Sequence, residues 1–177
     1  VWMVCMICLN FIDPGDTNAI YILDATMYIG GAFAPAFALL ISITFINGYD
    51  KLPRWCYSLY IVPLLTNIMV WTNPLHHLFY QVFSLRLDQI VFGPYIYVTS
   101  GYSTLCTVLS IVLMLTFAFR NRQQLYIRQA VCFSIGSFIP LVINLITTLG
   151  LADLTFAATP LGFVATIILH GLAIFYF

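Results

Sequence analysis

Long apolar stretches constrain this chain more than any other feature of its sequence. An α-helix rises about 1.5 Å per residue, so about 20 apolar residues are needed to cross the roughly 30 Å hydrocarbon core of a bilayer. Hydrophobic residues make up 62% of the chain and charged residues only 7%, a composition far from that of soluble domains. Transmembrane helices are therefore predicted at about residues 1–12, 19–46, 55–72, 95–119, 125–149 and 157–177.

The predicted fold class is all-α, a polytopic transmembrane helix bundle in which residues 1–177 form one domain. Six spans are visible, and the first is partial because the sequence opens inside an apolar run without an initiator methionine. Both ends are accordingly expected to be cuts. Only the break over residues 73–94 is long. There Phe83, Leu85 and Leu87 alternate with polar residues, which fits either a short β-hairpin or an irregular cap.

Basic residues lie in two of the shorter breaks. Lys51 and Arg54 fall in the connection after the second span, and three arginines within residues 120–128 flank the connection before the fifth. Because basic residues are retained on the cytoplasmic side of a membrane, both connections are predicted to be cytoplasmic. Alternation then places residues 73–94 outside the cell and the C-terminus in the cytoplasm. The formal net charge is zero, which argues against binding of nucleic acid.

Polar side chains inside the spans gather in the predicted outer half of the bundle. They are Asp24, Asn67, Tyr97, Tyr102, Asn144 and Thr159. An ionisable residue in a span suggests a function or a buried partner, but Asp24 lies close enough to the membrane surface to be a solvated or capping carboxylate instead. Asparagines in spans can also bridge helices. The cluster therefore indicates either a ligand-binding cavity that opens outward or ordinary helix packing.

Three spans contain an internal proline, namely Pro35, Pro63 and Pro140. Proline has no backbone N–H, so it frees a carbonyl of the preceding turn and kinks the helix. Other groups in the bundle must then satisfy the freed carbonyls. Kinked helices splay, which favours a cavity, although kinks without a cavity are the alternative.

The segment TNPLHHLFY follows the third span, and Asn73 before Pro74 is typical of a helix N-cap with proline at the first helical position. Polar residues with helical spacing are Asn73, His76, His77 and Tyr80. On one helix they would share a face. With the positive helix end nearby, this face would bind an anion or a carboxylate ligand. The alternative is that the rings anchor the helix end at the membrane surface.

No metal site, cofactor or catalytic site is predicted. His76 and His77 point in different directions on a helix, and His170 lies toward the opposite leaflet, so they are not expected to share a metal ion. No arrangement of nucleophile, base and oxyanion donors can be assembled, and no phosphate-binding glycine loop is present in the sequence. The chain is therefore expected not to be an enzyme.

Four segments together resemble the N-terminal seven-transmembrane sensor module of prokaryotic histidine kinases. They are PLLTNIMVWTNPLHHLFY, GPYIYVTSGYSTL, RQAVCFSIGSFIPLVINLI and ATPLGFVATIILHGLAIFYF. The residues that match the family pattern are Thr72, Asn73, His76 or His77, Arg128, Gln129, Pro140, Asn144, Thr159 and Pro160, with Asp24 as the acidic residue near a helix start. The resemblance implies a further helix before this chain and a catalytic kinase region after Phe177.

The chain is therefore expected to be the membrane-embedded sensory domain of a receptor in a two-component system, with the last helix relaying the signal to a cytoplasmic output domain. The predicted ligand-binding residues are Asp24, Asn67, Asn73, His76, His77, Tyr97, Tyr102 and Asn144. The alternative is a fragment of a small-solute transporter or permease, which would usually show an internal repeat. Expected partners are the lipid bilayer and a small molecule, with a homodimer as an option. The expected location is the plasma membrane of a prokaryote.

Overall fold

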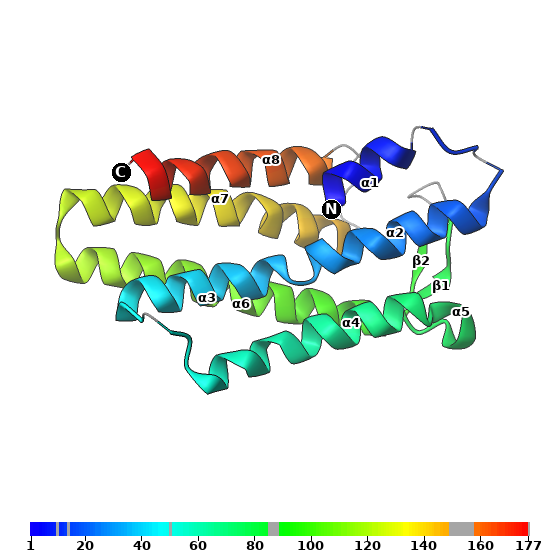
Figure 1. The fold of residues 1–177 in the computed structure, drawn as a ribbon, viewed down its shortest axis with the longest axis horizontal. Coiled ribbons are helices and arrows are strands. Elements are labelled where there is room, and N and C mark those ends of the chain that lie inside the picture. The colour runs from blue at the N-terminus through cyan, green and yellow to red at the C-terminus, as the bar shows by residue number, and fades with distance from the viewer. Residues whose placement is uncertain (10, 14, 50, 85–88, 149–157, 177) are drawn as a thin grey trace.

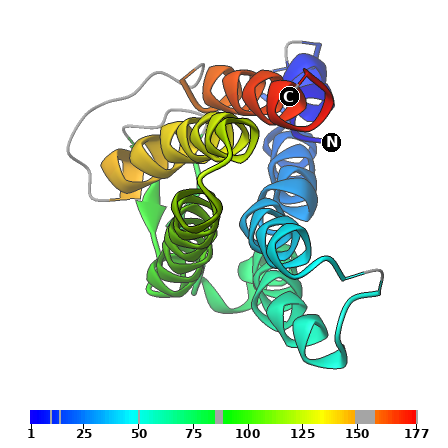
Figure 2. The same ribbon diagram turned by 90° about the vertical axis from the view of Figure 1, so that its left-hand side faces the viewer.

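The computed structural model describes residues 1–9, 11–13, 15–49, 51–84, 89–148 and 158–176. The helices are α1 (Trp2–Leu9), α2 (Thr17–Gly31), α3 (Ala34–Asn47), η1 (Arg54–Tyr60), α4 (Ile61–Trp71), α5 (Asn73–His76), α6 (Tyr95–Asn121), α7 (Gln124–Thr148), α8 (Ala158–Gly171) and the π-helical η3 (Leu172–Tyr176). Two short strands are β1 (Tyr80–Val82) and β2 (Val91–Phe92). The longer helices lie roughly side by side along one axis (Figures 1 and 2). We call the end with β1 and β2 the hairpin end, and the other the turn end.

The all-α class predicted from the sequence is confirmed. Three of the described helical segments are long and apolar enough to cross a membrane: Thr17–Asn47, Tyr95–Asn121 and Gln124–Ile146. They correspond to the second, fourth and fifth predicted spans. The other three predicted spans correspond to shorter helices. The first contains α1, which has eight residues, the third is divided between η1 and α4, and the last is divided between α8 and η3. Six complete spans therefore stay a prediction.

Local sequence signals explain where several helices begin and end. The Asp16 carboxylate accepts a hydrogen bond from the Ala19 N–H at 3.0 Å and caps the start of α2. α2 and α3 are separated at Ala32 and Phe33, with Pro35 in the first turn of α3, so the interruption predicted there is present. Gly48, with φ 62°, ends α3 in the left-handed conformation that glycine adopts at low cost.

The long connection between α4 and α6 contains a β-hairpin, one of the two alternatives indicated by the sequence. β1 pairs antiparallel with β2, with Tyr80 opposite Phe92. The alternating residues Leu85 and Leu87 lie outside the described residues. After β2 the backbone at Gly93 passes very close to the backbone of Leu78. A Cβ on residue 93 would lie 2.1 Å from the Leu78 carbonyl oxygen, so glycine is required at this position.

Two main groups of buried residues stabilise the two ends of the bundle. The core of the hairpin end consists of Ala25, Val70, Phe79, Tyr80 and Ile96. The core nearer the turn end consists of Met114, Ala118, Ala130, Phe133 and Ala173. Large aliphatic side chains such as Leu64 and Ile168 face outward instead, as expected where the surrounding solvent is lipid.

Candidate functional site

Asn73 holds the hairpin against the end of α4. Its Oδ1 accepts hydrogen bonds from the backbone N–H groups of Phe79 (2.8 Å) and Tyr80 (2.9 Å), and its Nδ2 donates to the Tyr80 carbonyl at 3.0 Å. The prediction that Asn73 caps a helix is therefore wrong, because Thr72 occupies the cap position and the Asn73 side chain turns back toward the hairpin. Asn73 is buried, so its amide satisfies backbone groups that have no water nearby.

The predicted polar face of Asn73, His76, His77 and Tyr80 is not formed. The helix α5 ends at His76, His77 adopts the left-handed conformation with φ 52°, and Tyr80 lies in β1. The His76 Nδ1 accepts from the Leu78 N–H at 3.0 Å, so the neutral ring carries its proton on Nε2, which lies 3.0 Å from the Thr72 hydroxyl. Hairpin pairing and these local bonds prevail over the helical spacing, because a single helical turn cannot align residues seven positions apart.

Asp24 meets the hairpin through Tyr80. The Tyr80 hydroxyl donates to the Asp24 Oδ2 at 2.9 Å and lies 3.1 Å from the Tyr28 hydroxyl. Burial, together with Tyr28 and the Asp24 carboxylate, raises the pKa of Tyr80 well above its ordinary value, so this hydroxyl remains a protonated donor. Asp24 therefore has a buried partner and is not the cap of α2. We call Asp24, Tyr28, Asn73 and Tyr80 the hairpin latch.

The other polar residues predicted to form the site do not gather around Asp24. Asn67 donates from Nδ2 to the carbonyl of Pro63 in its own helix, at 2.9 Å, and its Oδ1 is buried without a partner among the described residues. The Tyr102 hydroxyl donates to the Leu59 carbonyl, and Asn144 Oδ1 accepts from Ser100 at 2.8 Å. The four side chains of Asp24, Asn67, Tyr102 and Asn144 are not hydrogen-bonded to one another. Their predicted approach around one cavity that opens outward stays a prediction.

Three hydroxyl groups instead join helices at the carbonyl four residues before a proline, although the Val70 carbonyl also lies within reach of the Thr72 N–H. The carbonyl four residues before a proline loses its helical N–H donor. In three cases a hydroxyl from another helix donates to it. The Tyr21 hydroxyl donates to the Val70 carbonyl, four residues before Pro74, and the Tyr102 hydroxyl donates to the Leu59 carbonyl, four residues before Pro63. The Thr166 hydroxyl donates to the Gly136 carbonyl, four residues before Pro140. The kinked positions thus become points at which helices are fastened together.

The contact of α7 with α8 is close and polar. A Cβ on Gly136 would lie 2.9 Å from the His170 ring, and a Cβ on Gly162 would lie 2.6 Å from Ile143, so both glycines permit the approach. The His170 ring stacks on Phe133, with centroids 4.2 Å apart and planes 6° apart. We call this contact the α7–α8 seam, formed by Phe133, Gly136, Ser137, Gly162, Thr166 and His170.

Each polar side chain that α8 contributes to the seam has two acceptors within reach. The Thr166 hydroxyl lies 2.7 Å from the Gly136 carbonyl of α7 and 2.9 Å from the Gly162 carbonyl of its own helix. The His170 Nε2 lies 3.1 Å from the Ser137 hydroxyl and 3.2 Å from the Phe133 carbonyl. In the tautomer with its proton on Nε2, His170 has one proton for two acceptors, as the Thr166 hydroxyl does, so the seam can exchange partners without losing a hydrogen bond.

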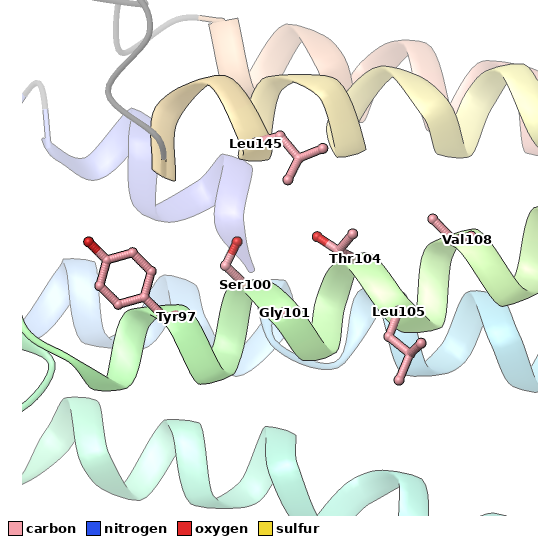
Figure 3. A pocket seen from close by; sticks show the side chains of 7 residues that line it. All are labelled: Tyr97, Ser100, Gly101, Thr104, Leu105, Val108 and Leu145. Atoms are coloured by element: carbon pink, nitrogen blue, oxygen red, sulfur yellow. The ribbon is translucent and has the colours of Figure 1, made fainter.

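Tyr97, the remaining predicted site residue, lies on the outside of the bundle. It lines an open groove between α6 and α7, together with Ser100, whose hydroxyl bonds Asn144 (Figure 3). Tyr97 and Asn144 therefore both lie where α6 meets α7, and neither is part of the hairpin latch.

The sequence analysis missed the hydroxyls that fasten the helices and the role of His170. One signal was available, since Gly162, Thr166 and His170 recur every fourth residue and so share one face of α8. A second was the carbonyl four residues before each proline. The side chains of Thr159 and Pro160, which belong to the family pattern, lie outside the described part of the chain.

Comparison with known proteins bears on this geometry. The sequence profile of one family, described as the N-terminal 7TM region of histidine kinase, matches residues 1–177. Among curated proteins and solved structures, nothing matches the chain. The family match extends over the whole sequence and confirms the resemblance inferred from its motifs. The chain therefore belongs to the family of N-terminal seven-transmembrane regions of histidine kinases, membrane modules that serve a sensory role.

Proposed function

We propose that the chain senses a stimulus at the hairpin end and relays it to a cytoplasmic output domain by moving α8 against α7. The observation that carries this proposal is the pair of alternative acceptors for Thr166 and for His170 in the α7–α8 seam. A relay needs an element with two arrangements of similar free energy, and exchangeable hydrogen bonds provide one.

Hydrogen bonds between successive helices support a route from the hairpin latch to α8. The latch acts on α2, which continues into α3. From there the links are Ser42 to Ser110 between α3 and α6 (2.7 Å), Ser100 to Asn144 between α6 and α7 (2.8 Å), and Thr166 to Gly136 between α7 and α8 (2.7 Å). A displacement of the hairpin would thus be transmitted through helices that are joined at each step.

The free energies of hydrogen bonds at the seam are comparable with typical coupling free energies between two sites. Interhelical hydrogen bonds in membranes contribute about 0.6 kcal/mol each on average. A stimulus that breaks one or two such bonds in one arrangement only would therefore alter the free-energy difference between the arrangements by about 1 kcal/mol. Typical coupling energies between two sites are about 1–3 kcal/mol, so a ligand that prefers one arrangement would shift the population of α8.

The turn end is proposed to face the cytoplasm of a prokaryotic cell. Lys51, Arg54 and the arginines at 120, 122 and 128 lie at or near this end, and α8 and η3 run toward it (Figure 1). The C-terminus would then meet a cytoplasmic kinase region, to which we assign the catalysis. Labelling of Ser84→Cys and Gln123→Cys variants in intact cells tests the orientation, since the first should react from outside and the second should not.

Kinase output from the full-length protein tests the relay. Thr166→Val keeps the shape of the side chain but removes the hydroxyl that bonds Gly136. We expect it to change basal autophosphorylation in liposomes by about threefold or more, at unchanged membrane abundance, because about 0.6 kcal/mol of bias is altered. The matched control is Thr116→Val, which removes an exposed hydroxyl bonded within α6. Equal activities of the two variants and the wild type would refute the relay through α8.

A further inference from the structure

The groove between α6 and α7 lies outside the hairpin latch and the α7–α8 seam. Its volume is about 440 Å³, within the range of sites for small molecules. Its lining residues are Tyr97, Ser100, Gly101, Thr104, Leu105, Val108 and Leu145 (Figure 3). Tyr97 and Leu105 are more than half exposed, so the groove opens to the surroundings of the bundle, which for this family is lipid.

The polarity of the groove changes along its length. Toward the hairpin end it has the Tyr97 hydroxyl and the hydrogen-bonded pair of Ser100 and Asn144. Farther along α6 the lining becomes aliphatic, with Leu105 and Val108. The step from residue 97 to residue 108 corresponds to about 16 Å along the helix axis, or about half the hydrocarbon core. A molecule lying in the groove therefore needs a polar head and an apolar tail, which together cover about one leaflet.

Thr104 indicates what the head must supply. Its hydroxyl oxygen is buried and has no hydrogen-bond partner among the described residues. A buried hydroxyl without a partner costs about 1–3 kcal/mol in proteins, and surrounding lipid tails offer no compensation. This oxygen has almost no accessible surface, so the Thr104 side chain must first rotate toward the groove, where a carbonyl oxygen would then accept its proton.

Gly101 keeps the floor of the groove open. A Cβ at this position would have nothing within 4 Å, in contrast to Gly136 and Gly162 in the seam. The open space is therefore not filled by the packing of neighbouring helices.

We propose that this groove binds a free single-chain acyl amphiphile, such as a long-chain fatty acid, from the leaflet at the hairpin end. Its carbonyl head lies among Tyr97, Ser100 and Thr104, and its chain runs past Leu105 and Val108. The site borders the Ser100–Asn144 bond of the proposed relay, but its occupancy does not depend on whether the relay is correct.

Photochemical labelling of the full-length kinase tests the proposal. The purified protein in phospholipid nanodiscs would be exposed to palmitic acid carrying a diazirine group, and labelled peptides mapped by mass spectrometry. We expect labels on α6 and α7 that unlabelled palmitic acid competes away. Gly101→Phe should reduce this labelling about tenfold by filling the groove, and Thr104→Val about threefold by removing the donor.

The matched control is Leu65→Phe, which adds the same ring to an exposed position on α4. Its labelling of α6 and α7 should equal that of the wild type, and all variants should elute as the wild type does. Labelling that persists in Gly101→Phe would overturn the proposal. So would labelling by a diazirine phospholipid that palmitic acid fails to displace, because the groove would then hold only surrounding lipid, and so would an absence of label in the wild type.

Discussion

The hairpin latch and the α7–α8 seam are both polar, yet their hydrogen bonds are organised differently. In the latch, Asn73 makes three bonds to the backbone of two neighbouring residues, and only the Tyr80 hydroxyl lies between two acceptors, Asp24 and Tyr28, within the same cluster. In the seam, Thr166 and His170 each lie between two acceptors. The comparison suggests that the hairpin end moves as a unit, whereas α8 is the part of the bundle that changes partners.

Packing explains part of this difference. The hairpin end is filled by aromatic rings in edge contacts, such as Tyr28 with Phe79 at 5.0 Å and Phe79 with Tyr80 at 4.9 Å. The connection is also fixed by Gly93, whose N–H donates to the Phe79 carbonyl at 2.7 Å. The seam instead joins two helices through glycines, small polar groups and the single stack of His170 on Phe133.

Asn73→Ala should show the largest effect. It leaves buried N–H groups of Phe79 and Tyr80 without their acceptor, and each such group costs about 1–3 kcal/mol. We expect a loss of stability of about 3 kcal/mol, measured by thermal unfolding of the purified protein in detergent. Leu75→Ala, at a position 85% exposed, is the control and should change little. Similar losses in the two variants would mean that the latch is not a fixed unit.

Gly136→Ala should have the next largest effect, through the seam. The added methyl would lie 2.9 Å from the His170 ring and 3.1 Å from the Leu169 Cβ, so α8 must move away. Overpacking of this kind costs about 1–3 kcal/mol. The control is Gly101→Ala, which meets no atom within 4 Å and should stabilise its helix by about 0.5–1 kcal/mol. Unfolding measurements in which the two substitutions behave alike would contradict the close packing of the seam.

Tyr80→Phe should have the smallest effect of the three. It removes the hydrogen bond to Asp24 but leaves the Asn73 bonds and the aromatic contacts in place. We expect the free energy of unfolding to fall by about 1–2 kcal/mol, and the backbone amides of residues 79 and 80 to exchange hydrogen faster. Tyr57→Phe, at an exposed tyrosine near the turn end, serves as the control. If hydrogen exchange in Tyr80→Phe is unchanged, the bond to Asp24 does not stabilise the hairpin.

Apolar run length and turn residues were enough to predict the main helices. The expected helix over 95–119 corresponds to α6, Tyr95–Asn121, and the one over 125–149 to α7, Gln124–Thr148. The sequence also predicted that prolines would free carbonyls for other groups. It did not predict which groups would bind them, because Tyr102 and Leu59 are brought together only by the packing of α6 beside η1.

The candidate site was harder to predict than the helices. Helical spacing suggested that Asn73 and Tyr80 share a helix face, but pairing of β1 with β2 placed Tyr80 in a strand. A local pattern cannot reveal that a distant strand competes for the same residues. A buried partner was one of the alternatives indicated for Asp24, because a carboxylate inside a span is costly, and Tyr80 is that partner.

Distances between spin labels test the central claim most directly. The full-length kinase, with the five cysteines of this region and any cysteine outside it replaced, would carry labels at Ile135 and Ile168 to report on the seam, or at Ile22 and Val82 to report on the latch; all four positions are exposed. The account predicts two distances for the seam pair, with populations that Thr166→Val shifts, and one narrow distance for the latch pair. A single narrow distance across the seam, unchanged by Thr166→Val, would contradict it.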